Sequence, residues 1–504
     1  MTRCVASGDQ EETRSSRSGQ SASELESPRI GTDSFYSGVP SLLARWSRAM
    51  ERQERGGSVG LTLVQRSSGH RPPKDAKIAL VLAGGAVTGG AFKVGGLKAL
   101  DDFLVGRKVT ELDMYVGLSA GAFLATSLAA GITPEEMIGA LEGTSSRLSQ
   151  LRPFDFYYPN LREMLSRPAV FSARLAGYLP GLVLDLISVL PQLPKRLGGR
   201  LRELLETPDY THLEAFLMQL FQEVSPKRQF PPLSSLWPSG LFENSALERW
   251  LSGNMAAIGT PNRFADLYRE TGKRLFITAT NLDTAERVVF GPDNDHGLTI
   301  SEAVQASSAL PGFYRPARLN GVDYVDGGVR RTANIDVAIE HGADLVICYN
   351  PFRPFLNIPR VEGGRRRGYL ADRGFSTVMN QVFRTLLHTR LALGLQTYLH
   401  DDRFRGDIVV IEARETDETF FAVGPLAFWK RADAVQHGFE SVSRTLSDHA
   451  DVLRPLFESY GLELRPTGST PQVESAPGAP AEEVPEAVAA ARGRMRLIRG
   501  QRTS

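Results

Sequence analysis

The chain of 504 residues lacks several features that mark common protein classes. It has two cysteines, Cys4 and Cys348, which are too few for a disulfide framework or a cluster of cysteine metal ligands. It contains no unbroken apolar segment long enough to cross a membrane, and its N-terminus lacks the apolar core of a secretory signal. These absences predict a cytoplasmic protein with no metal and no other cofactor.

An excess of charge of one sign is also absent. The 58 basic and 57 acidic side chains leave a net charge of +1, so no global field attracts nucleic acid, and we expect no nucleic-acid partner. Hydrophobic residues make up 42% and charged residues 23% of the chain, which is typical of globular proteins. The length suits one large domain with insertions, or two to three domains, and predicts no oligomeric state.

A serine in a Gly-x-Ser-x-Gly motif, Ser119, stands between an expected strand at 112–116 and an expected helix at 122–130. Gly117 and Gly121 allow neighbouring backbone to approach this sharp turn. Such a turn holds the hydroxyl clear of the sheet at a helix N-terminus, where the helix dipole favours negative charge. The motif also arises by chance in a chain with 48 glycines, but its strand and helix context predicts a nucleophile.

A glycine-rich turn at 84–90 follows an apolar run at 78–83 that is typical of a strand buried on both faces. Backbone N–H groups converge in a strand–turn–helix of this kind and can bind an anion. A dinucleotide site would need glycine at Ala86, and a phosphate loop would need lysine directly after Gly90. An oxyanion hole is the remaining use, and a turn required only for packing is the alternative.

The base that activates a serine is usually histidine, but none of the eight histidines follows a strand where a Ser-Asp-His order requires one. A carboxylate can replace histidine when it is held against the hydroxyl and partly desolvated. Asp326 is the best candidate, because it ends a strand-like run at 322–325 and precedes Gly327 and Gly328, which permit close approach.

Alternating apolar strands and helices predict an α/β fold with a mostly parallel central sheet sandwiched by helices. We expect five segments: a disordered tail and linker at 1–74, an α/β hydrolase domain at 75–350, a helical cap or lid inserted at 145–241, a helical C-terminal extension with a late strand at 351–465, and a disordered basic tail at 466–504.

The expected cap contains an apolar stretch at 175–193 that carries one charge and is interrupted by Pro180 and Pro191. It is too short and too broken to span a membrane. Four basic residues follow it directly: Lys195, Arg196, Arg200 and Arg202. Apolar and basic residues side by side suit a membrane surface, so we predict peripheral contact through 175–202. A helical cap packed over the core is the alternative, and the two roles are compatible.

Residues 77–350 resemble the patatin-like phospholipase family in four ordered blocks: the glycine turn at 84–90, the serine motif at 117–121, the stretch 302–313 and Asp326-Gly327-Gly328. The resemblance implies a lipid acyl hydrolase with a Ser–Asp dyad, acting on a phospholipid or another lipid ester. It implies Ser119 as nucleophile, Asp326 as base, and N–H groups near Gly84, Gly85 and Ala86 as oxyanion donors.

The match departs from the family pattern at two places. Ala86 replaces a glycine of the first block, Thr88 stands where the family has a basic residue, and Gly90 is an extra residue. After the aspartate block, 332–334 replaces the family's Asn-x-Pro. Two other functions compete with lipid hydrolysis: a Ser-His-acid esterase acting on soluble esters, and a lipid-binding protein whose catalytic site has decayed.

Overall fold

The computed structural model describes residues 60–67, 73, 75–224, 231–357, 361–362, 365–366, 368–401 and 403–465. The chain divides into Met1–Gly57, which lies outside these residues, and Ser58–Ser504. The expected basic tail at 466–504 and most of the expected tail and linker at 1–74 also lie outside them. No helix in the described ranges combines the length and the apolar character that crossing a bilayer requires.

A nine-stranded sheet forms the centre of the described chain. Its order is β1 (Leu61–Gln65), β15 (Asp407–Glu412), β12 (Leu345–Asn350), β2 (Ile78–Leu82), β4 (Met114–Gly117), β7 (Arg274–Asn281), β11 (Val322–Asp326) and β10 (Ala317–Leu319), and β8 (Arg287–Phe290) also pairs with β7. The run from β15 to β7 is parallel, and the remaining strands pair antiparallel. The predicted mostly parallel sheet is confirmed.

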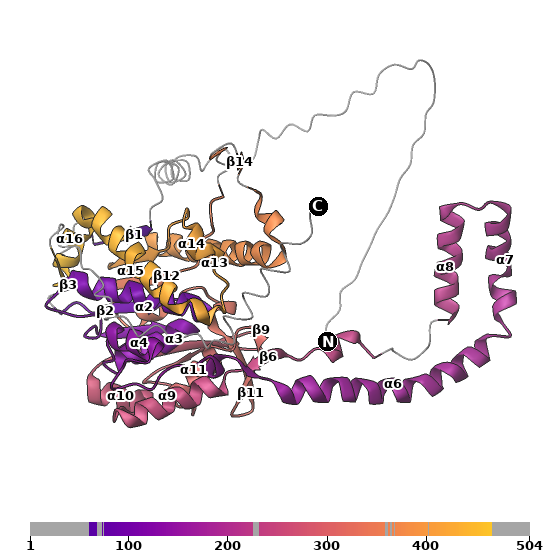
Figure 1. The fold of residues 1–504 in the computed structure, drawn as a ribbon, viewed down its shortest axis with the longest axis horizontal. Coiled ribbons are helices and arrows are strands. Elements are labelled where there is room, and N and C mark those ends of the chain that lie inside the picture. The colour runs from indigo at the N-terminus through magenta and orange to yellow at the C-terminus, as the bar shows by residue number, and fades with distance from the viewer. Residues whose placement is uncertain are drawn as a thin grey trace, which may run out of the picture. The chain divides into compact units, whose positions relative to one another are not determined.

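Side chains of the sheet alternate between two cores, so both faces are covered. Along β2, Ile78 and Leu80 belong to one core and Ala79 and Val81 to the other. The first core includes residues of α2 (Ala86–Phe103), α3 (Ala120–Ala129), α4 (Pro134–Glu142), α9 (Ser245–Ala257), α10 (Phe264–Thr271), α11 (Ile300–Ser307), α15 (Arg431–Asp448) and α16 (Ala450–Ser459). The second includes residues of α12 (Ile335–Glu340) and α13 (Phe375–Leu399) (Figure 1). Strands buried on both faces explain the continuous apolar runs in the sequence.

The sheet uses residues beyond the expected 75–350 segment. β1 lies within the expected linker and β15 within the expected C-terminal extension, and the two pair with each other at one edge. Helix α15 of the extension packs along α2. Pairing between strands so distant in sequence leaves no local signal, which is why the sequence alone did not place them in the sheet.

The segment expected as a cap is helical, with α5 (Pro153–Phe156), α6 (Leu161–Val189), α7 (Leu193–Glu206) and α8 (Tyr210–Val224). Pro180 was expected to interrupt its apolar stretch, but α6 continues through both Pro168 and Pro180. A proline removes one backbone hydrogen bond, and the leucine- and alanine-rich sequence around it favours helix strongly enough to continue. At the two ends of the segment, β5 (Tyr158–Pro159) pairs with β6 (Gly240–Glu243), and β6 pairs with β9 (Gly312–Tyr314).

Smaller elements complete the described chain: β3 (Leu104–Val105) pairs with β16 (Glu463–Leu464), β13 (Val361–Glu362) pairs with β14 (Arg365–Arg366), α14 is Glu418–Ala422, and short 3-10 turns lie at Leu233–Leu236, Gly327–Val329, Leu370–Arg373 and Phe428–Lys430.

Candidate active site

Ser119 occupies the turn between β4 and α3, with φ 54° and ψ −131°. A positive φ at a residue other than glycine is strained, and such strain is concentrated at functional sites. Glycine is required at both flanking positions, because neighbouring backbone lies too close to leave room for a side chain. A Cβ on Gly117 would lie 2.5 Å from the Gly121 carbonyl oxygen, and one on Gly121 would overlap the Leu82 carbonyl oxygen. The sequence therefore forms the sharp turn that the motif predicted.

The register of the sheet brings Asp326 to the level of Ser119. Gly117 on β4 is opposite Ile277 on β7, and Asp326 on β11 is opposite Ala279 on the same strand. Ser119 lies two residues beyond Gly117, and Ala279 lies two residues beyond Ile277. The serine and the aspartate therefore lie at the same end of the sheet, on either side of β7.

The Asp326 carboxyl group is buried, with 3% of the residue exposed. Oδ1 accepts the Gly328 N–H at 2.8 Å, whereas Oδ2 is buried without a hydrogen-bond partner among the described residues. Burial raises the pKa of Asp326 to about 6, against lowering by hydrogen bonding with the Ser119 hydroxyl, by the Gly328 N–H and by the charge of Lys93. Asp326 therefore lies near enough to the Ser119 hydroxyl for that group to lower its pKa, although Oδ2 makes no hydrogen bond of standard geometry.

The two glycines after Asp326 have different roles. The Gly328 N–H orients the carboxylate through the bond to Oδ1. Gly327 lies against the Thr278 carbonyl on β7, where a side chain would not fit. The turn that ends β11 is thereby held against the strand beside the serine.

Ser307, at the end of α11, fixes the backbone of Ser119. Its Oγ accepts the Ser119 N–H at 2.8 Å and donates to the Thr278 carbonyl at 2.7 Å. The Ser119 N–H is therefore already bonded. Asn334, in the stretch that departs from the family pattern, donates to Thr278 Oγ1 at 2.8 Å and supports the same strand. Ser307 lies in the quoted block 302–313, but nothing in the sequence assigned it this contact.

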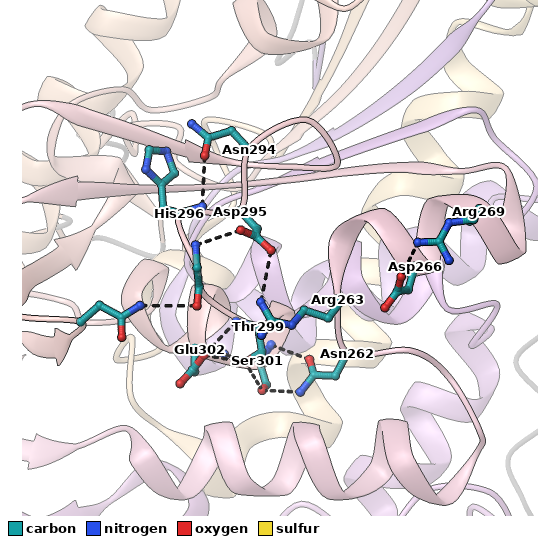
Figure 2. Close-up of polar contacts among 12 residues, drawn as sticks. Asn262, Arg263, Asp266, Arg269, Asn294, Asp295, His296, Thr299, Ser301 and Glu302 are labelled. Carbon is teal, nitrogen blue, oxygen red and sulfur yellow. Dashed lines mark hydrogen bonds and ion pairs between the residues drawn. The ribbon is translucent and has the colours of Figure 1, made fainter.

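The other end of α11 is held by a polar network (Figure 2). Thr299 Oγ1 accepts the Glu302 N–H, and the Glu302 carboxylate accepts the Thr299 N–H at 2.8 Å, which forms a capping box. Asn262 donates through Nδ2 to Ser301 Oγ at 2.8 Å and accepts the Ser301 N–H at 2.9 Å (Figure 2). With both ends bonded, α11 is a rigid support for the Ser119 turn.

The glycine turn is shorter than expected, because α2 begins at Ala86 and includes Gly89 and Gly90. The Gly89 N–H donates to the Gly85 carbonyl at 2.9 Å, which closes the first helical turn. Only Gly84 and Gly85 remain outside the helix.

Three consecutive N–H groups at this turn, those of Gly84, Gly85 and Ala86, have no hydrogen-bond partner among the described residues. A Cβ on Gly84 would lie 3.4 Å from the Ser119 Cβ, so the turn lies directly beside the serine. Ala86 lines the same cavity as Ser119, and so does Ala120, whose N–H begins α3. Free N–H groups at two helix N-termini can stabilise a developing negative charge.

Ser119 opens on a cavity that is partly open to solvent. Ser119 lines it from the N-cap of α3, and Phe123 and Ser127 line it from the next two turns of that helix. The other lining side chains are mostly apolar and include Val94, Leu124, Ile132, Met137, Leu141, Leu148, Leu151, Leu247, Leu251 and Met255. Within the described ranges, neither a histidine nor a residue of 161–224 lines this cavity.

The C-terminal extension reaches the same site. Thr88, which stands where the family has a basic residue, donates its hydroxyl to the Gly424 carbonyl at 2.7 Å and its N–H to the Pro425 carbonyl at 3.0 Å. Leu426 and Arg431 line the cavity. The start of α2 is therefore anchored by residues more than three hundred positions away.

Lys93 is a charged residue of the site that sequence reasoning missed. It is fully buried on α2, and its Nζ donates hydrogen bonds to the carbonyl oxygens of Ala83 and Gly84. Burial lowers the pKa of Lys93 to about 7, and the negative charge of Asp326 opposes this. The one signal in the sequence was a lysine within the otherwise apolar stretch 89–97.

A mostly parallel sheet flanked by helices, with a serine at a sharp strand–helix turn beside a glycine-rich turn, is typical of α/β hydrolases. The family described as patatin-like phospholipase matches residues 80–339, slightly more than half of the chain. The chain belongs to the patatin-like phospholipase family.

Similarity to individual proteins is more limited. The probable lipid hydrolase 463L of Invertebrate iridescent virus 6 is 27% identical over 104 residues, which cover 20% of this chain and 36% of the relative. YjjU of Escherichia coli K12, described as uncharacterized, is 26% identical over 114 residues, which cover 22% of this chain and 31% of the relative. The matches thus span about a third of these relatives.

Among solved structures, VipD from Legionella pneumophila has a TM-score of 0.30 at 17% identity, over 78% of this chain and 71% of that chain. Human GIVD cytosolic phospholipase A2, in complex with methyl gamma-linolenyl fluorophosphonate, has a TM-score of 0.30 at 12% identity, over 77% of this chain and 60% of that chain.

Proposed function

We propose that the chain hydrolyses carboxylic esters of lipids, with Ser119 as nucleophile and Asp326 as its base. The observation that carries the proposal is a serine at a strained strand–helix turn, which opens on an apolar cavity beside a buried carboxylate. Membership in the patatin-like phospholipase family and likeness to a probable lipid hydrolase support it.

In the first half of the reaction, Asp326 accepts the Ser119 hydroxyl proton while Oγ attacks the ester carbonyl carbon. The carbonyl oxygen becomes an oxyanion, which the N–H groups of Gly84, Gly85 and Ala86 bind. The tetrahedral intermediate then breaks its bond to the alcohol oxygen. The alcohol leaves with the proton from Asp326, and the acyl group stays on Ser119.

In the second half, Asp326 accepts a proton from water, and the hydroxide attacks the acyl carbon. The same N–H groups bind the second oxyanion. The bond to Ser119 Oγ breaks, Oγ recovers the proton from Asp326, and the free carboxylic acid leaves. Because its pKa is about 6, Asp326 is ionised at neutral pH and still more basic than an exposed carboxylate.

The cavity sets the substrate class. Its apolar lining suits a hydrocarbon chain, and burial of each methylene contributes about 0.8 kcal/mol. Ser127 follows Ser119 by eight residues on α3, so the lining extends at least about 12 Å from the nucleophile. We therefore propose an ester with a long acyl chain, such as a phospholipid.

Labelling by a fluorophosphonate probe, followed by peptide mass spectrometry, tests the assignment. We expect the probe on Ser119 in the wild type and no label in Ser119→Ala. Ser188→Ala, a matched substitution on the exposed side of α6, should label like the wild type. Absence of label from folded wild-type protein would instead favour the decayed lipid-binding protein.

We also propose that 175–202 makes peripheral contact with an anionic lipid surface. Apolar side chains of α6, including Val183, Leu184 and Ile187, are exposed. Helix α7 follows with four basic and two acidic residues, so its net charge is positive. Insertion of the apolar side chains into the lipid and attraction of the basic side chains to anionic headgroups both favour binding to this lipid surface.

Flotation with vesicles containing an anionic phospholipid tests this contact. Val183→Asp should reduce the bound fraction, because a charge replaces an apolar side chain that enters the lipid. Val452→Asp, which changes an exposed valine of α16, is the matched control and should bind like the wild type. Equal binding of the two variants would contradict the contact.

A further inference from the structure

Lys93 is a buried charged residue that the proposed mechanism does not use. It lies fully buried on α2, and its Nζ bonds the carbonyl oxygens of Ala83 and Gly84, the latter at 3.0 Å. A buried cation is costly unless acceptors or opposite charge compensate it. The titratable groups that act on it are Asp326 from β11 and Cys348 from β12. Burial raises the pKa of the Cys348 thiol, which is therefore neutral and leaves Asp326 as the counter-charge.

The carbonyl groups that Lys93 holds determine where the following N–H groups point. In a trans peptide, the C=O of one residue and the N–H of the next point in opposite directions. Because Ala83 and Gly84 both direct their carbonyl oxygens toward Nζ, the N–H groups of Gly84 and Gly85 both point away from it. Successive N–H groups on one side of a turn form a concave site for an anion.

We propose that Lys93 is a positioning residue, which orients the N–H groups of the glycine turn toward the oxyanion and holds a positive charge near Asp326. The proposal rests on the proposed function, because it acts through the donors and the base assigned there. Lys93 itself touches no substrate. Its charge favours the ionised form of Asp326, which is the form that accepts the serine proton. It also supplies a cation to the turn, which has Thr88 where the family has a basic residue.

The substitution Lys93→Met tests this, since methionine retains an unbranched apolar chain and removes both the donor and the charge. The matched control is Lys98→Met on the same helix, where Nζ bonds Asp102 instead of the turn. We expect the fluorophosphonate labelling rate of Ser119 and kcat to fall on the order of 10²-fold in Lys93→Met, with KM nearly unchanged. Lys98→Met should stay within about twofold of the wild type.

Two further readouts separate positioning from packing. When the labelling rate is plotted against pH, its acidic limb should move to higher pH in Lys93→Met, because without the cation the pKa of Asp326 rises. Lys93→Gln keeps an N–H donor without the charge, and we expect a smaller loss of labelling with a similar shift of the limb.

Equal labelling rates for folded Lys93→Met and Lys98→Met, or an unchanged acidic limb, would overturn the proposal and leave the role of Ser119 intact. Loss of folding in both Lys93 variants, seen by circular dichroism, would also overturn it, because packing alone would then explain the residue. Wild-type protein that does not label at Ser119 would overturn the proposed function instead.

Discussion

The candidate active site and the inserted helices use apolar residues in opposite ways. In α3, which begins at the elbow, eight of ten residues are buried. In α6, by contrast, apolar side chains such as Leu184 and Ile187 are 62% and 60% exposed. The first region buries its apolar residues beside the Ser119 turn, and the second leaves them exposed. Apolar content alone therefore does not distinguish a core helix from a surface one.

The two regions also differ in how closely their backbones approach neighbouring segments. At the centre, Gly117 and Gly121 let β2, β4 and α3 meet without side chains between them. The glycines of α6 and α7, at 177, 198 and 199, have no heavy atom near the position of a Cβ. Most of the following predictions pair a substitution at the centre with the same substitution in the inserted segment 161–224, so that each pair tests the contrast.

Removal of the nucleophile or the base should have the largest effect. Ser119→Ala and Asp326→Asn should each lower kcat on the order of 10⁴-fold, because attack needs both the hydroxyl and a group to accept its proton. Ser188→Ala on α6 and Asp209→Asn before α8 should leave kcat unchanged on a soluble ester. Substantial activity in folded Asp326→Asn would contradict the dyad, and an essential histidine would then be sought.

The pH dependence of activity should follow Asp326, whose pKa burial raises to about 6. Activity requires the ionised carboxylate, so kcat/KM should fall about tenfold for each pH unit below pH 6. The Asp209→Asn variant should show the same profile as the wild type. A profile flat down to pH 5 would show that a group of lower pKa limits the reaction.

The contribution of Asp326 to stability should change with pH in the opposite direction to its contribution to activity. The pKa of Asp326 is higher in the folded chain than its ordinary value of 3.8, so its stabilising contribution is complete below that value and lost as pH rises through about 6. Asp326→Asn should therefore raise the free energy of unfolding at neutral pH by up to about 3 kcal/mol, measured by denaturant titration. A destabilised variant would contradict the net cost of burying this carboxylate, which the Gly328 N–H, the Ser119 hydroxyl and Lys93 offset only in part.

A substitution in the cavity should change the preference between esters of different acyl-chain length. Ser127→Leu adds volume two turns from the nucleophile, so it should reduce the kcat/KM ratio of palmitoyl to butyryl esters about tenfold. Ser188→Leu on α6 makes the same change away from the cavity and should leave the ratio unaltered. If both variants retained the wild-type ratio, the acyl chain would have to lie elsewhere.

The smallest effect should follow loss of one anchor of α2. Thr88→Val removes the hydroxyl that bonds the Gly424 carbonyl and keeps the shape of the side chain. We expect a loss of about 1 kcal/mol in the free energy of unfolding and a fall in kcat of about fivefold. Thr207→Val removes an exposed bond to the Glu203 carbonyl after α7 and should change neither measurement.

Local signals in the sequence were enough for most elements near the site. The strands expected at 78–83, 112–116 and 322–325 and the helix expected at 122–130 are present as β2, β4, β11 and α3, with bounds within two residues of those predicted. The elbow was predicted because a strand, a glycine-flanked serine and a helix lie within twenty residues of one another. Signals of this kind depend on near neighbours only.

Features that depend on distant neighbours were missed. The contact of Ser307 with the Ser119 backbone joins residues 188 positions apart. The bonds of Lys93 depend on a carbonyl orientation that no residue type encodes. Strand β1 lies in the segment predicted to be linker, because its partner β15 is so far along the chain. The continuation of α6 through Pro180 has a local cause instead, because the leucine and alanine residues around the proline favour a helix.

The pairing of β1 with β15 has a consequence for synthesis of the chain. Leu61 pairs with Ile411, and Thr88 is anchored at Gly424, so the earliest strand and the glycine turn wait for partners that the ribosome adds late. A nascent chain that already contains Ser119 therefore still has an unanchored turn and an open sheet edge. Translation itself thus delays the moment at which the surroundings of Ser119 are complete.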